Sequence, residues 1–235
     1  MTSNRTVELY FSFVSLWSYI GSRRFHQLLK QTESKVIYKP INLLHTFSIS
    51  GGLPVKQRAE QRQAYRLIEM ERWKRIRDIE LVLNPKYYPA DPSLAHRVLI
   101  AATEELGHDN PSVQKYVHAG LEAVWARELD ISNPETVNLL ADEAGLEGIR
   151  LVDRARKESK LAEFEATLTE EAGSRKVFGA PFYFYQNEPL WGQDRLEMLE
   201  EIIQSGRSAI LEPKYTAYIG NQASNIDRRR PSGSI

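Results

Sequence analysis

The sequence predicts an α/β fold in which an all-helical domain is inserted into the middle of a small sheet. Segments rich in aromatic and β-branched residues, which are typical of strands, occur near the two ends of the 235-residue chain. Between them lies a long series of segments with the apolar spacing of helices. Hydrophobic residues make up 42% of the chain, which is enough for a substantial core.

The N-terminal part has the order strand, turn, helix, strand. Residues 6–13 are predicted to form a strand and residues 14–18 a turn, and residues 19–31 show helical spacing. A second strand over 35–39 is stopped by Pro40. Such a unit implies a right-handed crossover between parallel neighbours.

The middle of the chain is predicted to be helical apart from two loops. Three prolines mark residues 84–92 as a loop, and glycines make residues 45–54 a loop or broken helix. Asn133 is expected to cap a helix that has Pro134 at its first position and ends at Gly145. The other helices are expected over residues 56–79, 94–106, 112–128 and 147–170.

The C-terminal part returns to strands and completes the sheet. A strand over 176–185, interrupted by Gly179 and Pro181, is followed by a turn at 186–188 and a short strand over 189–191. A closing helix over 194–206 follows. A β-α-β unit, a block of helices and a β-β-α unit together describe a thioredoxin-like sheet with a helical insertion.

The predicted organisation therefore has three parts. Residues 1–40 and 174–206 form the thioredoxin-like domain, residues 41–173 the inserted helical domain, and residues 207–235 a C-terminal tail. The tail is poor in large apolar residues, which favours a loosely packed segment, although its leucine and tyrosines leave docking on the body or a partner chain open.

Charge and residue usage exclude several function classes. The 31 basic and 31 acidic residues give zero net charge, so nothing draws the protein globally to nucleic acid or an acidic membrane. Cysteine is absent, which excludes disulfides, thiolate metal sites and a cysteine nucleophile, and we expect no bound metal. Polar residues interrupt the apolar segment 7–19, so we expect no signal peptide, no membrane span and a cytoplasmic protein. Any thiol chemistry must then come from a bound small molecule.

Three short segments carry the candidate chemistry. Ser15 follows a strand and precedes a helix, where backbone N–H groups and the helix dipole favour an anion, although a serine there is also an ordinary helix cap. Pro181 opens an otherwise good central strand, so we predict a cis Ala180–Pro181 bond that turns the backbone of Ala180 towards a ligand; an edge strand or bulge is the alternative. Gln193 and Asp194 open the last helix, where Asp194 either binds an ammonium group or simply caps.

Together these segments resemble the 2-hydroxychromene-2-carboxylate isomerase and kappa-class glutathione transferase family. Residues 14–19 (Val-Ser-Leu-Trp-Ser-Tyr) are similar to its Ser-Pro-aromatic-Ser-Tyr segment. Residues 178–181 (Phe-Gly-Ala-Pro) and 191–196 (Trp-Gly-Gln-Asp-Arg-Leu) are similar to its C-terminal signature. The helix over 65–73 resembles the family's Tyr…Arg-Trp helix, and the resemblance extends over about residues 6 to 205.

The resemblance implies a site and a chemistry. Ser15 would face the sulfur of glutathione, Ala180 before the cis Pro181 would pair with its cysteinyl backbone, and Gln193 and Asp194 would hold its γ-glutamyl group. The expected activity is a glutathione-dependent isomerase or transferase that acts on an aromatic or polyketide-like conjugated carbonyl by reversible thiolate addition. The resemblance also suggests a homodimer. The aromatic substrate would lie in a pocket lined by Trp17, Phe47, Tyr88 and Trp191.

The sequence departs from the family pattern at four positions. Leu16 replaces a proline, Ser48 a lysine, Gly52 an asparagine and Arg62 a lysine, and such residues contact glutathione or substrate in the family. Two alternatives therefore stay open. One is a pathway-specific enzyme on the same fold that no longer uses glutathione, and the other is a non-catalytic thioredoxin-like binding protein. His26 and His45 match no family position and are expected to be surface or packing residues.

Overall fold

The computed structural model describes residues 5–211, and its central feature is a four-stranded sheet. The strands β1 (Thr6–Phe11), β2 (Lys35–Pro40), β3 (Phe182–Tyr185) and β4 (Glu188–Trp191) lie in the order β2-β1-β3-β4. β1 is parallel to β2 and antiparallel to β3, and β3 is antiparallel to β4. This is the mixed sheet of a thioredoxin-like α/β fold, so the predicted fold class is confirmed.

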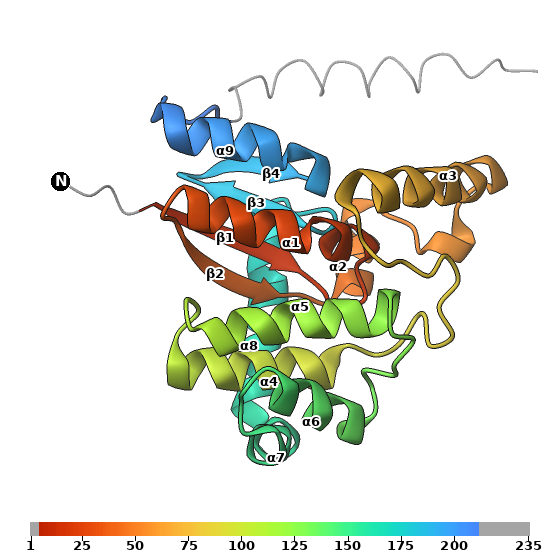
Figure 1. The fold of residues 1–235 in the computed structure, drawn as a ribbon, viewed down its shortest axis with the longest axis vertical. Coiled ribbons are helices and arrows are strands. Elements are labelled where there is room, and N and C mark those ends of the chain that lie inside the picture. Colours follow the sequence, from red (N-terminus) through yellow and green to blue (C-terminus); the bar gives the residue numbers. More distant parts are fainter. Residues whose placement is uncertain (1–4, 212–235) are drawn as a thin grey trace, which may run out of the picture.

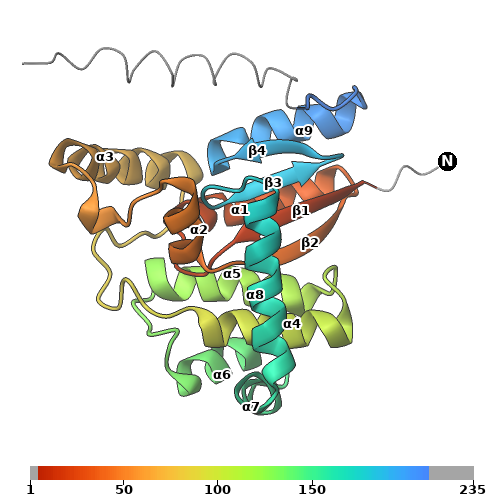
Figure 2. The same cartoon turned by 180° about the vertical axis from the view of Figure 1, so that it is seen from behind.

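Helices cover both faces of the sheet, and α4 to α7 lie beyond its β2 edge (Figure 1, Figure 2). In Figure 1, α1 (Leu16–Gln31) and α9 (Leu196–Ser205) cover the front face, while Figure 2 shows α8 (Ser159–Ser174) crossing the rear face. The other helices are α2 (Leu43–Ser50), α3 (Glu60–Arg77), α4 (Ser93–Leu106), α5 (Pro111–Trp125), α6 (Pro134–Glu143) and α7 (Gly148–Lys157). Residues 41–173 contain no strand, as the sequence predicts.

Two cores correspond to the two faces of the sheet. The larger includes Leu9, Phe11 and Tyr183 and continues into α1, α4 and α5. The smaller lies on the α8 side of the sheet and consists of Tyr10, Ile41, Ala172, Val177, Phe182 and Phe184. Because side chains alternate along a strand, neighbouring residues of β1 and β3 belong to different cores. The burial of all four β3 residues fits this central position.

Several predicted boundaries were wrong, each for a local reason. The first strand ends at Phe11 instead of residue 13, because Ser12 C=O accepts a hydrogen bond from Ser15 N–H and closes a turn. The segment 45–54, predicted as a loop or broken helix, overlaps α2, which starts earlier with Asn42 as its cap and ends at Gly51, at φ +77°. The strand expected to begin at residue 176 begins at Phe182, after the turn that Val177 N–H makes with Ala172 C=O.

Two long predicted helices are each interrupted. The segment 56–79 divides into a short 3-10 helix η1 (Val55–Gln57) and α3, and the segment 147–170 divides into α7 and α8 at the extended residue Glu158. The predicted cap of α6 is confirmed, since Asn133 Oδ1 accepts from Glu135 N–H at 2.8 Å. Within residues 5–211, no helix combines the length and apolar character that a bilayer span requires.

The end of the described chain is attached to β4. Arg207 forms an ion pair with Glu188 at 2.8 Å, and the N–H of Ile210 donates to the same carboxylate at 2.7 Å. The remainder of the predicted tail, residues 212–235, lies outside the described residues, so the proposed docking of its tyrosines is not addressed.

Candidate functional site

Ser15 lies where β1 has turned into α1, and its hydroxyl joins two of the three predicted segments. Ser15 is the N-cap of α1 and is buried, with 4% of its surface exposed. Its Oγ accepts from Ser18 N–H at 3.2 Å and donates to the C=O of Ala180 at 3.1 Å. The serine therefore caps the helix and also contacts the residue before Pro181, while its predicted role beside an anion stays a prediction.

Several backbone N–H groups in these two segments have no hydrogen-bond partner among the described residues. Within residues 5–211, the N–H groups of Leu16, Trp17 and Ala180 make no hydrogen bond. The first N–H groups of a helix have no acceptor inside the helix and, with the helix dipole, favour a negative charge. The arrangement therefore offers an anion several amide donors beside a hydroxyl.

The cis peptide bond before Pro181 is confirmed and connects the third segment to the first two. Ala180–Pro181 is cis, and the N–H of Gly192 donates to the C=O of Pro181 at 3.0 Å. The hairpin between them turns at Gln186 and Asn187, both of which have positive φ. A second cis bond, Tyr88–Pro89, was not predicted.

A buried histidine of the helical insertion, His96 on α4, forms a hydrogen bond with the turn before Ser15. The N–H of Phe13 donates to Nε2 of His96 at 3.4 Å, so the ring proton of His96 lies on Nδ1 and is donated to Glu165 at 2.8 Å. Arg97 donates to the other oxygen of Glu165 at 3.0 Å. Because His96 is fully buried, this contact fixes the turn from α4 and α8.

Gln193 packs against α1 at Gly21 and accepts hydrogen bonds from Arg77, a residue that the sequence analysis did not single out. Its side chain is buried, and its Oε1 accepts from Nε and Nη2 of Arg77 at 3.2 and 3.1 Å. Gly21 permits this packing, since a Cβ there would lie 2.7 Å from that of Gln193. The amide orientation is therefore set by α3.

Asp194 remains accessible, with 45% of its side chain exposed, and pairs with Arg195 at 2.7 Å. Gly192 has φ +104°, and a Cβ there would lie 2.4 Å from Oδ1 of Asp194. Gly192 is thus needed both for its backbone conformation and to leave space for the carboxylate.

The four aromatic residues of the predicted pocket are distributed over different surroundings. Trp17 and Tyr88 are half-buried against the larger core, and the Tyr88 ring lies 4.6 Å from that of Trp125. Phe47 lies under the guanidinium of Arg58, 5.9 Å from the ring centre. Trp191 is 53% exposed and pairs in register with Phe182, a residue of the smaller core. The grouping of these four residues in one substrate pocket therefore stays a prediction.

The two largest departures from the family pattern have local explanations. A Cβ on Gly52 would lie 2.5 Å from the ring of Phe47, so an asparagine there would require that ring to move. Ser48 is exposed, and its hydroxyl donates to the C=O of His45 at 2.8 Å.

Other polar features lie away from this site. His26 donates to or accepts from Tyr38 Oη at 2.7 Å, and burial lowers the pKa of its ring to about 4, which fits the expected packing role. A depression of about 640 Å³ between α6 and α7 is lined by none of the site residues. Among residues 5–211, no three His, Cys, Asp or Glu side chains are grouped as metal ligands would be.

The family follows from comparison with known proteins. A model of the DSBA-like thioredoxin domain matches residues 6–204. The chain belongs to this family. A 2-hydroxychromene-2-carboxylate isomerase of Sphingobium xenophagum is 24% identical over 200 residues, which cover 85% of this chain and 98% of that protein. The resemblance inferred from the three motifs is thereby confirmed.

Two solved structures share the fold. The structure of a 2-hydroxychromene-2-carboxylate isomerase superposes with a TM-score of 0.72 at 22% identity, covering 94% of this chain and 98% of that one. The cytosolic disulfide reductase DsbM of Pseudomonas aeruginosa, solved with GSH, gives a TM-score of 0.62 at 13% identity, covering 86% and 98% of the two chains. At these identities the superpositions establish the fold.

Proposed function

We propose that this protein is a glutathione-dependent isomerase or transferase that acts on an aromatic or polyketide-like conjugated carbonyl compound. The observation that carries the proposal is the position of the Ser15 hydroxyl. It lies at the N-terminus of α1, 3.1 Å from the C=O of Ala180 beside the cis proline, among N–H groups with no partner in residues 5–211. This is the environment that a thiolate needs.

The thiolate has to come from a ligand, because the chain contains no cysteine. A free thiol has a pKa of about 8.5, and a helix N-terminus lowers such values. In the structure the hydroxyl of Ser15 donates its proton to the C=O of Ala180. Rotation of the hydroxyl would redirect this proton to a sulfur atom, while its lone pairs continue to accept from Ser18 N–H.

The residues around Ser15 fit the remainder of glutathione. Ala180 offers a free N–H and a C=O to the cysteinyl unit, and Asp194 offers an accessible carboxylate to the γ-glutamyl ammonium group. Gln193 would support that end from its position on Arg77. The fold relative solved with GSH supports this choice of thiol.

The acceptor would be a conjugated carbonyl compound beside Trp17, Phe47 and Tyr88. When bound, glutathione would supply a thiolate that adds to the conjugated double bond and leaves after rotation about the resulting single bond. The relatives named as isomerases of 2-hydroxychromene-2-carboxylate support this class of substrate.

A turnover assay tests the proposal. Purified protein is incubated with 2-hydroxychromene-2-carboxylate, with and without glutathione, and the isomer is followed by absorbance. Turnover should require glutathione and should fall roughly ten-fold or more in Ser15→Ala, because a charge-assisted hydrogen bond is lost. Ser174→Ala removes an exposed hydroxyl of α8 that donates to Glu171 C=O, and should leave turnover unchanged. Conversion that is equally fast without glutathione would contradict the proposal.

A second candidate follows from the surroundings of Phe47. Because its ring lies over Gly52 where the family has an asparagine, one expected glutathione contact is replaced by an aromatic surface. An enzyme on this fold that works without glutathione would show this change. Turnover of the same substrate by glutathione-free protein would favour it.

We also propose that the active form is a homodimer. Large apolar side chains are exposed on α2 and α3, among them Leu44 (65%), Ile49 (57%), Ile68 (49%) and Ile76 (65%). Exposed apolar groups of this extent are typical of protein contacts. Sedimentation at micromolar concentration should give twice the monomer mass, and Ile76→Glu should shift the protein to the monomer.

A further inference from the structure

The inward side of α3 has two arginines in opposite situations. Arg66, Met70, Trp73 and Arg77 follow one another at the spacing of one helix face, and Met70 is fully buried. The guanidinium of Arg77 lies 5.1 Å from the ring centre of Trp73. That of Arg66 lies 5.5 Å from the ring centre of Trp125 and 6.0 Å from that of Tyr88. Each arginine therefore stacks on aromatic rings.

Arg77 is fully occupied by protein partners. Besides its two hydrogen bonds to Oε1 of Gln193, it pairs with Glu197 at 3.0 Å. The guanidinium thus has a carboxylate and an amide oxygen in reach. Its role in holding Gln193 needs nothing from outside the chain.

Arg66 has no such partner. Its one hydrogen bond within residues 5–211 is from Nη1 to the thioether Sδ of Met70 at 3.1 Å, and sulfur is a weak acceptor. Arg58, a nearby cation, donates to the C=O of Leu53 at 2.8 Å and likewise forms no ion pair within that range. Burial lowers the pKa of both guanidinium groups, with added repulsion from Arg58 at Arg66 and from Arg62 at Arg58, and the neighbouring Tyr88 opposes the shift at both.

Neighbouring cations without a carboxylate partner are unfavourable, because burial weakens their hydration while their repulsion grows. An anion bound at Arg66 would relieve both effects. The planar fork of donors on arginine matches a carboxylate in particular. The rings of Tyr88 and Trp125 beside Arg66, and of Phe47 beside Arg58, would favour a flat, conjugated body on that anion.

We propose that Arg66, assisted by Arg58, is the specificity-determining residue that holds the carboxylate of a planar conjugated acid, the acceptor substrate of the proposed reaction. The part of this inference that makes the bound acid the acceptor substrate rests on the proposed function. The binding of a planar acid at Arg66 does not depend on it. Arg66 lies eleven residues before Arg77, which is about 16 Å along the helix axis. It is therefore well separated from Gln193, where the γ-glutamyl group of glutathione is proposed to lie.

Calorimetric titration with cinnamate and its uncharged amide, cinnamamide, tests the site directly. The protein should bind cinnamate more tightly than cinnamamide. Arg66→Met should weaken cinnamate binding roughly ten- to a hundred-fold, because the carboxylate loses a charged hydrogen-bond donor. The same variant should leave cinnamamide binding unchanged. Arg66→Lys should bind cinnamate with an affinity between those of the unmodified protein and Arg66→Met. It also provides a test if Arg66→Met does not fold. Arg72→Met, on the same helix but paired with Glu69, is the matched control and should not change either affinity.

Titration of the same variants with glutathione separates the two possible sources of the carboxylate. Glutathione affinity should be unchanged in Arg66→Met. A loss of glutathione affinity with cinnamate binding unaffected would assign the carboxylate to glutathione and overturn the proposal, as would equal affinities for cinnamate and cinnamamide in the unmodified protein. Charge-selective binding of cinnamate by a protein that does not bind glutathione would support this site while contradicting the proposed function.

Discussion

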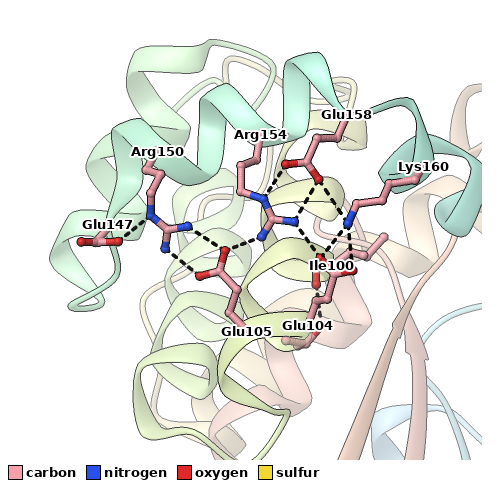
Figure 3. A network of polar contacts seen from close by, with 9 residues as sticks. Ile100, Glu104, Glu105, Glu147, Arg150, Arg154, Glu158 and Lys160 are labelled. Atoms are coloured by element: carbon pink, nitrogen blue, oxygen red, sulfur yellow. Dashed lines mark hydrogen bonds and ion pairs between the residues drawn. The ribbon is translucent and has the colours of Figure 1, made fainter.

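Two groups of arginines in this molecule show how differently the same side chain can be used. On the outer surface, Arg150 of α7 contacts Glu105 and Glu147, and Arg154 contacts Glu104, Glu105 and Glu158, a network completed by Lys160 (Figure 3). Every cation there faces carboxylates of the chain. On the inner side of α3, Arg66 faces aromatic rings and another cation.

The difference separates structural charges from charges available to a ligand. In the network, the pKa values of Glu105 and Glu158 are lowered to about 2, because arginines donate hydrogen bonds to these carboxylates. For Arg58 and Arg66 the pKa shift is downward, because burial outweighs the opposing effect of Tyr88 and no carboxylate pairs with either guanidinium within residues 5–211. An arginine that the fold itself does not neutralise is the better candidate for a binding residue.

Supplying Arg66 with a carboxylate of the chain would remove the contrast between the two groups of arginines. This change should have the largest effect of the three, a loss of cinnamate affinity. Arg62→Glu places an acid four residues before Arg66 on α3, where the two side chains can pair. Arg62→Gln is the control, because it removes the same cation without adding an acid. We expect cinnamate to bind roughly ten-fold more weakly to the Glu variant than to the Gln variant in calorimetry. Equal affinities would show that Arg66 does not bind the carboxylate.

Removing each α3 arginine in turn sharpens the contrast through stability. Arg77→Met leaves the buried amide oxygen of Gln193 without its donor and removes one of the two ion pairs that Glu197 forms in the described part of the chain, and should lower the free energy of unfolding by about 1–3 kcal/mol. Arg66→Met leaves no acid unpaired and should change it by less than about 1 kcal/mol, the worth of a stacking contact. Urea denaturation followed by circular dichroism measures both. A larger loss for Arg66→Met than for Arg77→Met would mean that Arg66 is the structural residue.

The surface network should give the smallest effect. Glu105→Gln should change the free energy of unfolding by less than about 1 kcal/mol at neutral pH, because exposed ion pairs are well solvated, and by less in high salt. Since the folded pKa of Glu105 lies below its ordinary value, the stabilisation is complete above about pH 4.5 and is lost as the pH falls towards 2. Denaturation midpoints of both forms across this range measure it, and a difference that grows on acidification would have the wrong sign.

Sequence reasoning predicted two local features that the structure confirms, Ser15 at the start of α1 and the cis bond before Pro181. A strand followed by Ser15 and a helix, or a proline at the entrance of an aromatic strand, has a meaning that does not depend on the remainder of the fold. The boundary errors are also local. The choice between loop and broken helix at α2 stayed open because Gly51 and Gly52 follow it closely, and the break at Glu158 has no glycine or proline to indicate it.

The distinction between Arg66 and Arg77 could not be read from the sequence. Both arginines belong to the same periodic stripe of α3, and the spacing predicts only that they share a face. What separates them is that Gln193 and Glu197, more than a hundred residues later, reach only Arg77. The tertiary position of α9 decides this, and no local pattern encodes it.

The environment of Ser15 is the central claim, and the thiolate absorbance of bound glutathione against pH tests it most directly. In the unmodified protein the pKa of the bound thiol should lie below the free value of about 8.5. In Ser15→Ala it should rise by on the order of one to two units, with glutathione affinity falling less. Asn133→Ala removes a helix cap of α6 at a similar cost of about 1 kcal/mol and should leave the titration unchanged. Identical titration curves for Ser15→Ala and the unmodified protein would contradict the account.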